Sequence, residues 1–95
     1  MINIAIIGLG YWGPNLLRNF SNNNKCNIIT VCDLDVSKIR IFKSEYKNIN
    51  FTNDINKIYN DVRINAIVIA TPVNTHFNIA KKSLLMGKHV FVEKP

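Results

Sequence analysis

Three glycines near the N-terminus have the spacing of a turn that binds phosphate groups. Gly8, Gly10 and Gly13 come directly after the apolar run Ile2–Ile7 and directly before Pro14, a residue favoured in the first turn of a helix. In a strand–turn–helix unit, the first glycine permits a tight turn, the second lets backbone touch a pyrophosphate, and the third lets helix and strand pack closely. The unpaired N–H groups at the helix start favour an anion. This segment therefore predicts a dinucleotide site.

An acidic residue stands where the adenosine ribose of a dinucleotide would need it. Asp33 ends a second apolar run, Ile28–Cys32, and lies 20 residues after Gly13, which is the spacing of the ribose-binding carboxylate. A carboxylate at this strand end accepts hydrogen bonds from both ribose hydroxyls and repels a 2′-phosphate. The residue type therefore favours NAD over NADP.

Charged neighbours leave two questions open around Asp33. Lys38 and Arg40 lie close by in the sequence and offer the positive charge that would accommodate the 2′-phosphate of NADP. The alternative to ribose binding is a purely structural role, in which an aspartate caps the helix that begins near Val36. This alternative applies above all to Asp35, because Asp is a favoured N-cap residue.

Polar residues also follow the last two apolar runs of the chain. In an open parallel sheet, ligands bind outside the carboxyl ends of the strands, close to the point where the strand order reverses. Two segments follow strands in this way, and both are therefore expected beside the nicotinamide half of the cofactor. The first comprises Ala70, Thr71, Pro72, Asn74 and His76, and the second comprises Glu93, Lys94 and Pro95.

Several of these residues have a structural alternative to a cofactor contact. Thr71 and Asn74 offer polar groups to the ribose or nicotinamide, while Pro72 holds the strand exit rigid. Asn74 is equally a candidate helix N-cap, as is Asn53. His76 falls in the first turn of a helix, where a histidine is as often packed or solvated as part of a site.

Two aromatic residues, Tyr11 and Trp12, occupy the variable positions of the glycine turn. Trp12 is placed to stack on the cofactor or to cover the mouth of the substrate site. Packing against the following helix is the alternative for aromatic residues in this loop.

Strands and helices must alternate to position these residues. The connections between apolar runs are too long for hairpins and long enough for helices, which indicates a parallel sheet. Right-handed crossovers then predict a Rossmann-type, doubly wound α/β sheet with strand order 3-2-1-4-5, truncated after the fifth strand. Strands are expected at Ile2–Ile7, Asn27–Cys32, Asn48–Phe51, Ala66–Ala70 and His89–Val92, and helices at about Pro14–Phe20, Val36–Tyr46, Asp54–Tyr59 and Thr75–Met86.

Apolar spacing predicts which faces of the elements are buried. The first and fourth strands are continuous apolar runs, as expected of central strands. The fifth is an unprotected edge that carries apolar side chains. Gly87 is expected to end the last helix in a left-handed conformation. Inward helix faces are predicted from Ile39, Phe42 and Tyr46, and from Phe77, Ala80 and Leu84.

Length and composition exclude several classes of protein. The 95 residues fit one domain, and no apolar run approaches the ~20 residues of a membrane span. The net charge of +6 comes from scattered Lys and Arg, Lys88 among them, which form no basic run and most of which look like solvated helix faces. Nucleic-acid binding is therefore not expected. Cys26 and Cys32 lack metal-ligand spacing and are expected to be neutral thiols, with no metal site. A cytoplasmic location is expected because the N-terminus lacks signal-peptide features.

The ordered combination of these motifs resembles the N-terminal nucleotide-binding domain of the Gfo/Idh/MocA oxidoreductase family over essentially all 95 residues. The resemblance implies hydride transfer between a sugar or nucleotide-sugar hydroxyl carbon and NAD, with NADP less favoured. It places Lys94 near the reacting hydroxyl, as a catalytic hydrogen-bonding or proton-transfer residue. Glu93 is then expected to orient the ribose or the lysine.

The resemblance also implies parts that this sequence does not contain. Family members carry a second α/β domain that supplies the substrate pocket and often an oligomer interface. Because the sequence stops at Pro95, this substrate domain is expected to be absent and the 95-residue chain alone to be inactive. The alternative is a non-catalytic module that binds a dinucleotide without turning it over.

Overall fold

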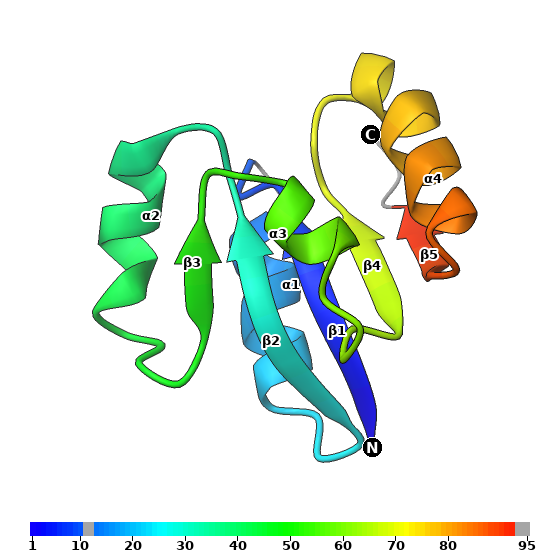
Figure 1. The fold of residues 1–95 in the computed structure, drawn as a ribbon. Helices are drawn as coiled ribbons and strands as arrows, with labels where there is room; N and C mark the ends of the chain where they lie inside the picture. Colours follow the sequence, from blue (N-terminus) through cyan, green and yellow to red (C-terminus); the bar gives the residue numbers. More distant parts are fainter. Residues whose placement is uncertain (11–12, 93–95) are drawn as a thin grey trace.

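Five parallel strands form one sheet with helices on both faces (Figure 1), in a computed structural model that describes residues 1–10 and 13–92. The strand order is β3-β2-β1-β4-β5, and every pairing is parallel. The predicted Rossmann-type fold and strand order are therefore confirmed. The strands are β1 (Ile2–Ile7), β2 (Cys26–Cys32), β3 (Asn50–Thr52), β4 (Ala66–Ile69) and β5 (His89–Val92), and the helices are α1 (Gly13–Ser21), α2 (Val36–Lys43), α3 (Asn56–Tyr59) and α4 (His76–Leu85).

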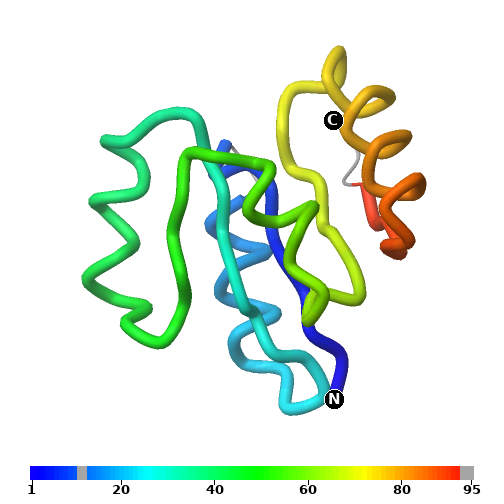
Figure 2. Tube along the Cα trace, in the orientation of Figure 1, coloured from blue at the N-terminus to red at the C-terminus, as the bar shows by residue number. Residues whose placement is uncertain are grey.

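The central strand β1 supplies side chains to two apolar clusters, one on each face of the sheet. Ile4 and Ile6 pack with Leu17 of α1, whereas Ala5 and Ile7 pack with Ile58 of α3. Figure 1 shows α1 behind the sheet and α3 in front of it, and the chain trace in Figure 2 follows both crossovers. Alternation along one fully covered strand therefore builds both halves of the core.

The predicted inward face of α2 is confirmed. Ile39 is buried, and Phe42 packs against the α1-side cluster. Tyr46 packs there too, although α2 ends at Lys43 and leaves Tyr46 in the following loop.

The predicted inward face of α4 is only partly right. Phe77 and Leu84 are 74% and 61% exposed, while Ala80 packs on the core as expected, together with Ile79. Ser83 is completely buried. Its hydroxyl can be buried without water because it donates a hydrogen bond to the Ile79 carbonyl at 2.7 Å, within the same helix. Small residues at this face let the helix lie close to the sheet, and the larger apolar side chains are left outside.

Both predicted asparagine caps are wrong. Asn53 lies two residues before Ile55, the N-cap of α3, and Asp54 accepts a hydrogen bond from the Asn56 amide at 3.0 Å instead. Asn74 lies inside a single 3₁₀ turn, Val73–Thr75, which precedes α4. This turn delays the start of the helix, so Asn74 falls too early to cap it.

Lys88 departs from the interpretation that the lysines are solvated. Only 7% of the residue is exposed, and its Nζ donates to the carbonyl oxygens of Asp61 at 2.6 Å and Ile64 at 3.0 Å. The two carbonyls accept two of the three ammonium hydrogens inside the protein. Lys88 therefore ties the start of β5 to the loop between α3 and β4.

The end of α4 follows the prediction for Gly87. Its φ is +77°, its amide donates to the Leu84 carbonyl at 3.0 Å, and the Lys88 amide donates to the Ser83 carbonyl at 3.0 Å. This pair of bonds is a Schellman motif, which turns the chain directly into β5. There, Phe91 and Val92 are 53% and 39% exposed, as expected of an edge strand.

A substitution at Gly87 measures how much the left-handed backbone conformation at this position destabilises a residue other than glycine. Steric clashes do not contribute, because an added Cβ would meet nothing within 4 Å. We expect Gly87→Ala to lower the free energy of unfolding by about 1 kcal/mol. Gly87→Asn should lower it less, because Asn tolerates the left-handed region. Urea unfolding followed by circular dichroism measures both variants. An Ala variant as stable as the parent protein would contradict the assignment.

Candidate functional site

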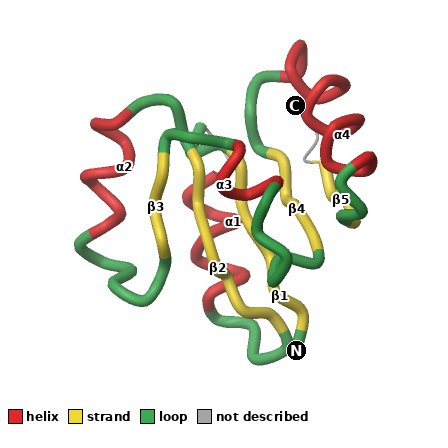
Figure 3. Tube along the Cα trace, viewed as in Figure 1, coloured by secondary structure: helices red, strands yellow, loops and turns green. Residues whose placement is uncertain are grey.

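A cavity of about 460 Å³ opens at the carboxyl ends of the strands, within the range of small-molecule sites. In Figure 3 the loops that follow β2, β3 and β4 lie together at this edge of the sheet. Six of the predicted site residues line it: Gly8, Gly10, Asp33, Ala70, Thr71 and Pro72. The other described lining residues are Ile7, Cys32, Leu34, Asp35, Lys38, Ile55, Thr75 and Ile79.

The glycine turn is built from backbone in contact with backbone. Gly8 has a φ of +104°, and a Cβ there would lie 2.7 Å from the Ala70 carbonyl carbon and 2.8 Å from the Thr71 nitrogen. A Cβ at Gly13 would lie 2.5 Å from the Gly8 carbonyl oxygen. The predicted tight turn at Gly8 and close packing at Gly13 are therefore confirmed, because neither position has room for a side chain.

Gly10 differs from the other two glycines of the turn. Among the described residues that are not its chain neighbours, the atom nearest to a Cβ there would be the Ala70 carbonyl oxygen, at an ordinary contact distance of 3.5 Å, and the φ of Gly10 is not positive. The described part of the fold therefore leaves room for a methyl group at this position. What Gly10 provides is bare backbone on the wall of the cavity.

The carboxylate of Asp33 holds two loops together. Its Oδ2 accepts a hydrogen bond from the Leu9 amide at 2.6 Å, and its Oδ1 accepts one from the Asp35 amide at 2.8 Å. A carboxylate has about four acceptor positions, so two lone-pair sites remain after these bonds. Asp33 thus fixes the glycine turn against the exit of β2 and still presents acceptor capacity to the cavity.

Asp35 is the N-cap of α2, as the structural alternative predicted. Its Oδ1 accepts a hydrogen bond from the Ser37 amide at 3.0 Å and also contacts the Ser37 hydroxyl. The hydroxyl bond, followed by the amide bond, lowers the pKa of the Asp35 carboxyl below its ordinary value. Asp35 therefore adds a second negative charge to the cavity wall at neutral pH.

The loop between β4 and α4 is closed by its own hydrogen bonds. The hydroxyls of Thr71 and Thr75 are 2.6 Å apart, and the Thr75 hydroxyl donates to the Pro72 carbonyl at 2.6 Å. The His76 ring meets the Thr71 carbonyl oxygen at 2.6 Å through Nε2. Among the described residues, His76 and Asn74 stand outside the cavity lining, and Asn74 is exposed.

Sequence reasoning missed several lining residues for different reasons. Leu34 directly follows Asp33 and is 86% exposed at the cavity rim, so its position next to a predicted ligand was an available signal. Lys38 had been considered only as the cation for a 2′-phosphate. Ile55, the N-cap of α3, and Ile79 of α4 pack on the same core cluster, and only the packed fold brings them to the cavity.

Five predicted residues lie outside the described part of the chain. Tyr11 and Trp12 of the glycine turn, and the segment Glu93, Lys94 and Pro95, belong to this group. Their predicted roles stay predictions.

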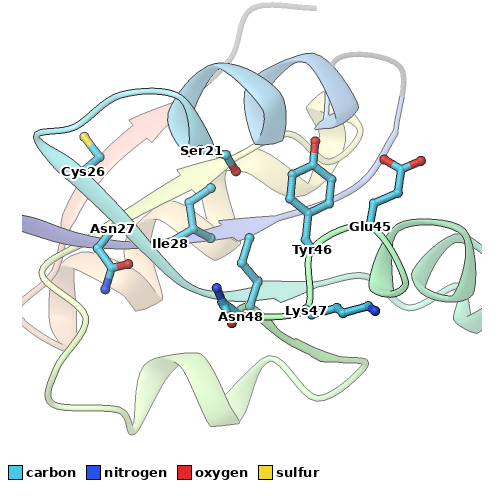
Figure 4. Close-up of a pocket in the computed structure, with 9 residues that line it drawn as sticks. Ser21, Cys26, Asn27, Ile28, Glu45, Tyr46, Lys47 and Asn48 are labelled. Atoms are coloured by element: carbon cyan, nitrogen blue, oxygen red, sulfur yellow. The ribbon is translucent and has the colours of Figure 1, made fainter.

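A second hollow, of about 280 Å³, lies at the opposite edge of the sheet. Figure 4 shows Cys26 and Asn27 on β2, with Tyr46 and Lys47 on the loop that leads to β3. None of the predicted site residues in the described ranges lines this hollow. The chemistry expected from the sequence therefore gathers at the carboxyl edge.

Comparison with known families agrees with the geometry of the carboxyl-edge cavity. The model of the oxidoreductase family with an NAD-binding Rossmann fold matches residues 2–95. The chain belongs to the Gfo/Idh/MocA oxidoreductase family. The resemblance predicted from the motifs is thereby confirmed, and this chain is a member of the family through its NAD-binding part.

Relatives in the Gfo/Idh/MocA family are several times longer than this chain. It is 30% identical to the uncharacterized oxidoreductase YdgJ of Escherichia coli K12, covering 99% of this chain and 27% of that protein. It is 29% identical to 1-carboxy-3-chloro-3,4-dihydroxycyclohexa-1,5-diene dehydrogenase of Comamonas testosteroni, covering 99% and 24%. The chain thus spans about a quarter of the length of these relatives.

A solved structure of the family aligns with the whole chain. Scyllo-inositol dehydrogenase from Lactobacillus casei, crystallised with NAD(H) and scyllo-inositol, superposes with a TM-score of 0.89 and 26% sequence identity. The match covers 100% of this chain and 28% of that one. The similarity confirms that the sheet and its carboxyl edge follow the dehydrogenase arrangement.

Residues 1–10 and 13–92 were also compared with the requirements of a membrane-spanning helix and of a metal site. No helix there has the length and apolar character to cross a bilayer. Within the same ranges, no group of three or more His, Cys, Asp or Glu side chains could hold a metal ion.

The thiol of Cys32 provides a chemical probe of the cavity. Burial, followed by the charges of Asp33 and Asp54, raises its pKa from 9.0 to about 11. In a Cys26→Ser variant, we expect alkylation of Cys32 by iodoacetamide to reach half its maximal rate only near pH 11. The same variant unfolded in urea should do so near pH 9. A midpoint near 9 in the folded protein would contradict this prediction.

Proposed function

We propose that the carboxyl-edge cavity binds NAD(H) and that the chain forms the cofactor-binding part of an oxidoreductase. The observation that carries the proposal is the bare Gly10 backbone facing the cavity beside the acceptor positions of Asp33 that the described amides of Leu9 and Asp35 leave open. Backbone without side chains suits a pyrophosphate, and a strand-end carboxylate suits a ribose diol. The residues present therefore fit a dinucleotide.

The chain's own residues would bind and orient the cofactor. The Gly8–Gly10 turn and the first turn of α1 would receive the pyrophosphate, because the amide groups at a helix start favour an anion. Asp33 would accept hydrogen bonds from the ribose hydroxyls, and Leu34 offers an apolar surface at the rim for the adenine. A bound NAD(H) would supply hydride transfer to or from the substrate.

NAD is the preferred cofactor in this proposal, with NADP less favoured. Asp33 and Asp35 both line the cavity, and two carboxylates disfavour the added phosphate of NADP. Lys38 also lines the cavity and partly offsets their charge. The balance of two negative groups against one positive group supports a preference for NAD without forbidding NADP.

The substrate we propose is a sugar or nucleotide-sugar whose hydroxyl-bearing carbon exchanges hydride with the nicotinamide. The polyol named with the Lactobacillus casei structure supports a polyhydroxylated substrate. Lys94, outside the described residues, is the proposed catalytic group that hydrogen-bonds the reacting hydroxyl, with Glu93 orienting it. A second domain for the substrate, homo-oligomers and a cytoplasmic location belong to the same proposal.

Substitution of Gly10 tests cofactor binding without disturbing the fold. In Gly10→Ala, the methyl group would have room among the described residues but would enter the space that the pyrophosphate would need. We expect an unchanged urea midpoint and NADH affinity reduced at least tenfold, a loss of about 1.4 kcal/mol or more. Titration followed by nicotinamide fluorescence gives the affinity.

A second glycine variant of the same turn separates loss of binding from loss of stability. Gly13→Ala, whose Cβ would meet the Gly8 carbonyl oxygen at 2.5 Å, should lower stability and NADH binding together. If Gly10→Ala binds NADH as well as the parent protein, the pyrophosphate does not cross this turn and the proposed site is wrong.

The role of Asp33 in cofactor choice is tested with a variant that keeps one acceptor oxygen. Asp33→Asn removes the charge but can still accept from the Leu9 or the Asp35 amide. We expect its preference for NADH over NADPH to fall several-fold in parallel titrations. Glu45→Gln, at an exposed glutamate on the hollow at the opposite edge of the sheet, is the control for net charge. An equal change in both variants would rule out a specific role for Asp33.

A further inference from the structure

We infer that His76 is a positioning residue that shapes the cofactor cavity through the backbone of Thr71. The inference rests on the proposed function, in that the cavity is taken to bind NAD(H). His76 is half-buried at the first position of α4, and among the described residues it lies outside the cavity lining. Thr71, to which it is bonded, lies on the cavity wall.

The contact fixes the protonation pattern of the imidazole ring. Nε2 of His76 lies 2.6 Å from the carbonyl oxygen of Thr71. A carbonyl oxygen only accepts hydrogen bonds, so Nε2 must carry the hydrogen. In the neutral ring, Nδ1 is then the unprotonated nitrogen, and the Nε2–H donor is present in both the neutral and the cationic form.

The same loop also fixes the direction of the threonine hydroxyls. Thr75 donates its single hydroxyl hydrogen to the Pro72 carbonyl, so the 2.6 Å contact between Thr71 and Thr75 requires Thr71 to be the donor. The Thr71 hydroxyl therefore has only lone pairs left for a ligand. A ligand group that meets it must donate, as a ribose hydroxyl or a carboxamide N–H does.

Backbone contact carries the effect of His76 from Thr71 to the glycine turn. The Ala70–Thr71 peptide lies against Gly8 so closely that a Cβ there would be 2.7–2.8 Å from three of its atoms. The Thr71 carbonyl held by His76 belongs to the next peptide along the chain. Releasing this carbonyl lets the peptide move, and with it the wall that faces Gly8 and Gly10. His76 thus sets the geometry of the cavity without touching its contents.

Paired variants of His76 test the inference, because Gln reaches with an amide N–H where the imidazole Nε2–H lies, and Leu does not. Without cofactor, we expect His76→Leu to shift the amide ¹H–¹⁵N resonances of Thr71 and Gly8, and His76→Gln to bring them back towards the parent positions. The imidazole ¹⁵N shifts of the parent protein should show hydrogen on Nε2. His89→Gln, at an exposed histidine at the start of β5, is the control.

Cofactor titrations provide the second measurement. NADH affinity should fall about five- to tenfold in His76→Leu, the effect of one lost hydrogen bond, and stay within about threefold of the parent in His76→Gln. Urea midpoints correct the affinities for any unfolded fraction. A purely structural role would lower the midpoint and leave the corrected affinity unchanged.

The outcomes separate this inference from the proposed function. If the parent protein binds no NADH, the proposed function fails, while the resonance shifts still decide whether His76 positions the loop. If the shifts in His76→Leu stay within residues 74–78, or the Gln variant restores nothing, the positioning role is overturned. Shifts at Gly8 and a restored affinity in the Gln variant support it.

Discussion

The contact between the glycine turn and the exit of β4 governs the arrangement of the site. Gly8 and the Ala70–Thr71 peptide meet backbone to backbone, at a distance that no side chain can enter. The amide of Ala70 also donates to the Ile7 carbonyl at 2.8 Å, and the amide of Gly8 donates to the Cys32 carbonyl at 2.7 Å. The exits of three neighbouring strands are therefore held against one another by backbone hydrogen bonds at the base of the cavity.

Asp33 shows how one side chain serves the fold and the site together. Its two oxygens are already engaged by amides of two loops, so the carboxylate is oriented before any ligand arrives. Such a group gives up little side-chain freedom on binding, which is the general advantage of a preorganised site. The same dependence makes Asp33 costly to replace, because a side chain without acceptor oxygens would also release the glycine turn.

Much of the fold could be predicted from the sequence because its signals are local and strong. The continuous apolar runs of β1 and β4, the glycine spacing and Gly87 each impose a backbone conformation that few alternatives satisfy. The buried face of α4 could not be predicted in this way. Apolar residues occur all around that helix, so in the sequence the predicted face of Phe77, Ala80 and Leu84 is as convincing as the observed one, which contains Ile79 and Ala80. Only the folded structure, in which Ser83 is completely buried and Ile79 packs on the core, decides between them.

The residues of the candidate site likewise fall into those that local sequence signals predict and those that depend on packing. Residues that follow strands in sequence, such as Asp33 and Thr71, could be placed at the cavity by topology alone. Ile55 and Ile79 could not, because their presence depends on how far two helices extend over the sheet. The hydrogen bond of His76 was equally out of reach, since it depends on the 3₁₀ turn that separates β4 from α4.

The enclosed ammonium group of Lys88 makes this lysine a reporter of local opening. Its Nζ reacts with an acylating reagent only after both bonds, to the carbonyls of Asp61 and Ile64, have broken. The labelling rate at this one amine therefore measures how often the corner between β5 and the α3–β4 loop comes apart, whereas labelling at exposed lysines measures only access to solvent. An enzyme that acetylates lysines would likewise have to wait for that opening.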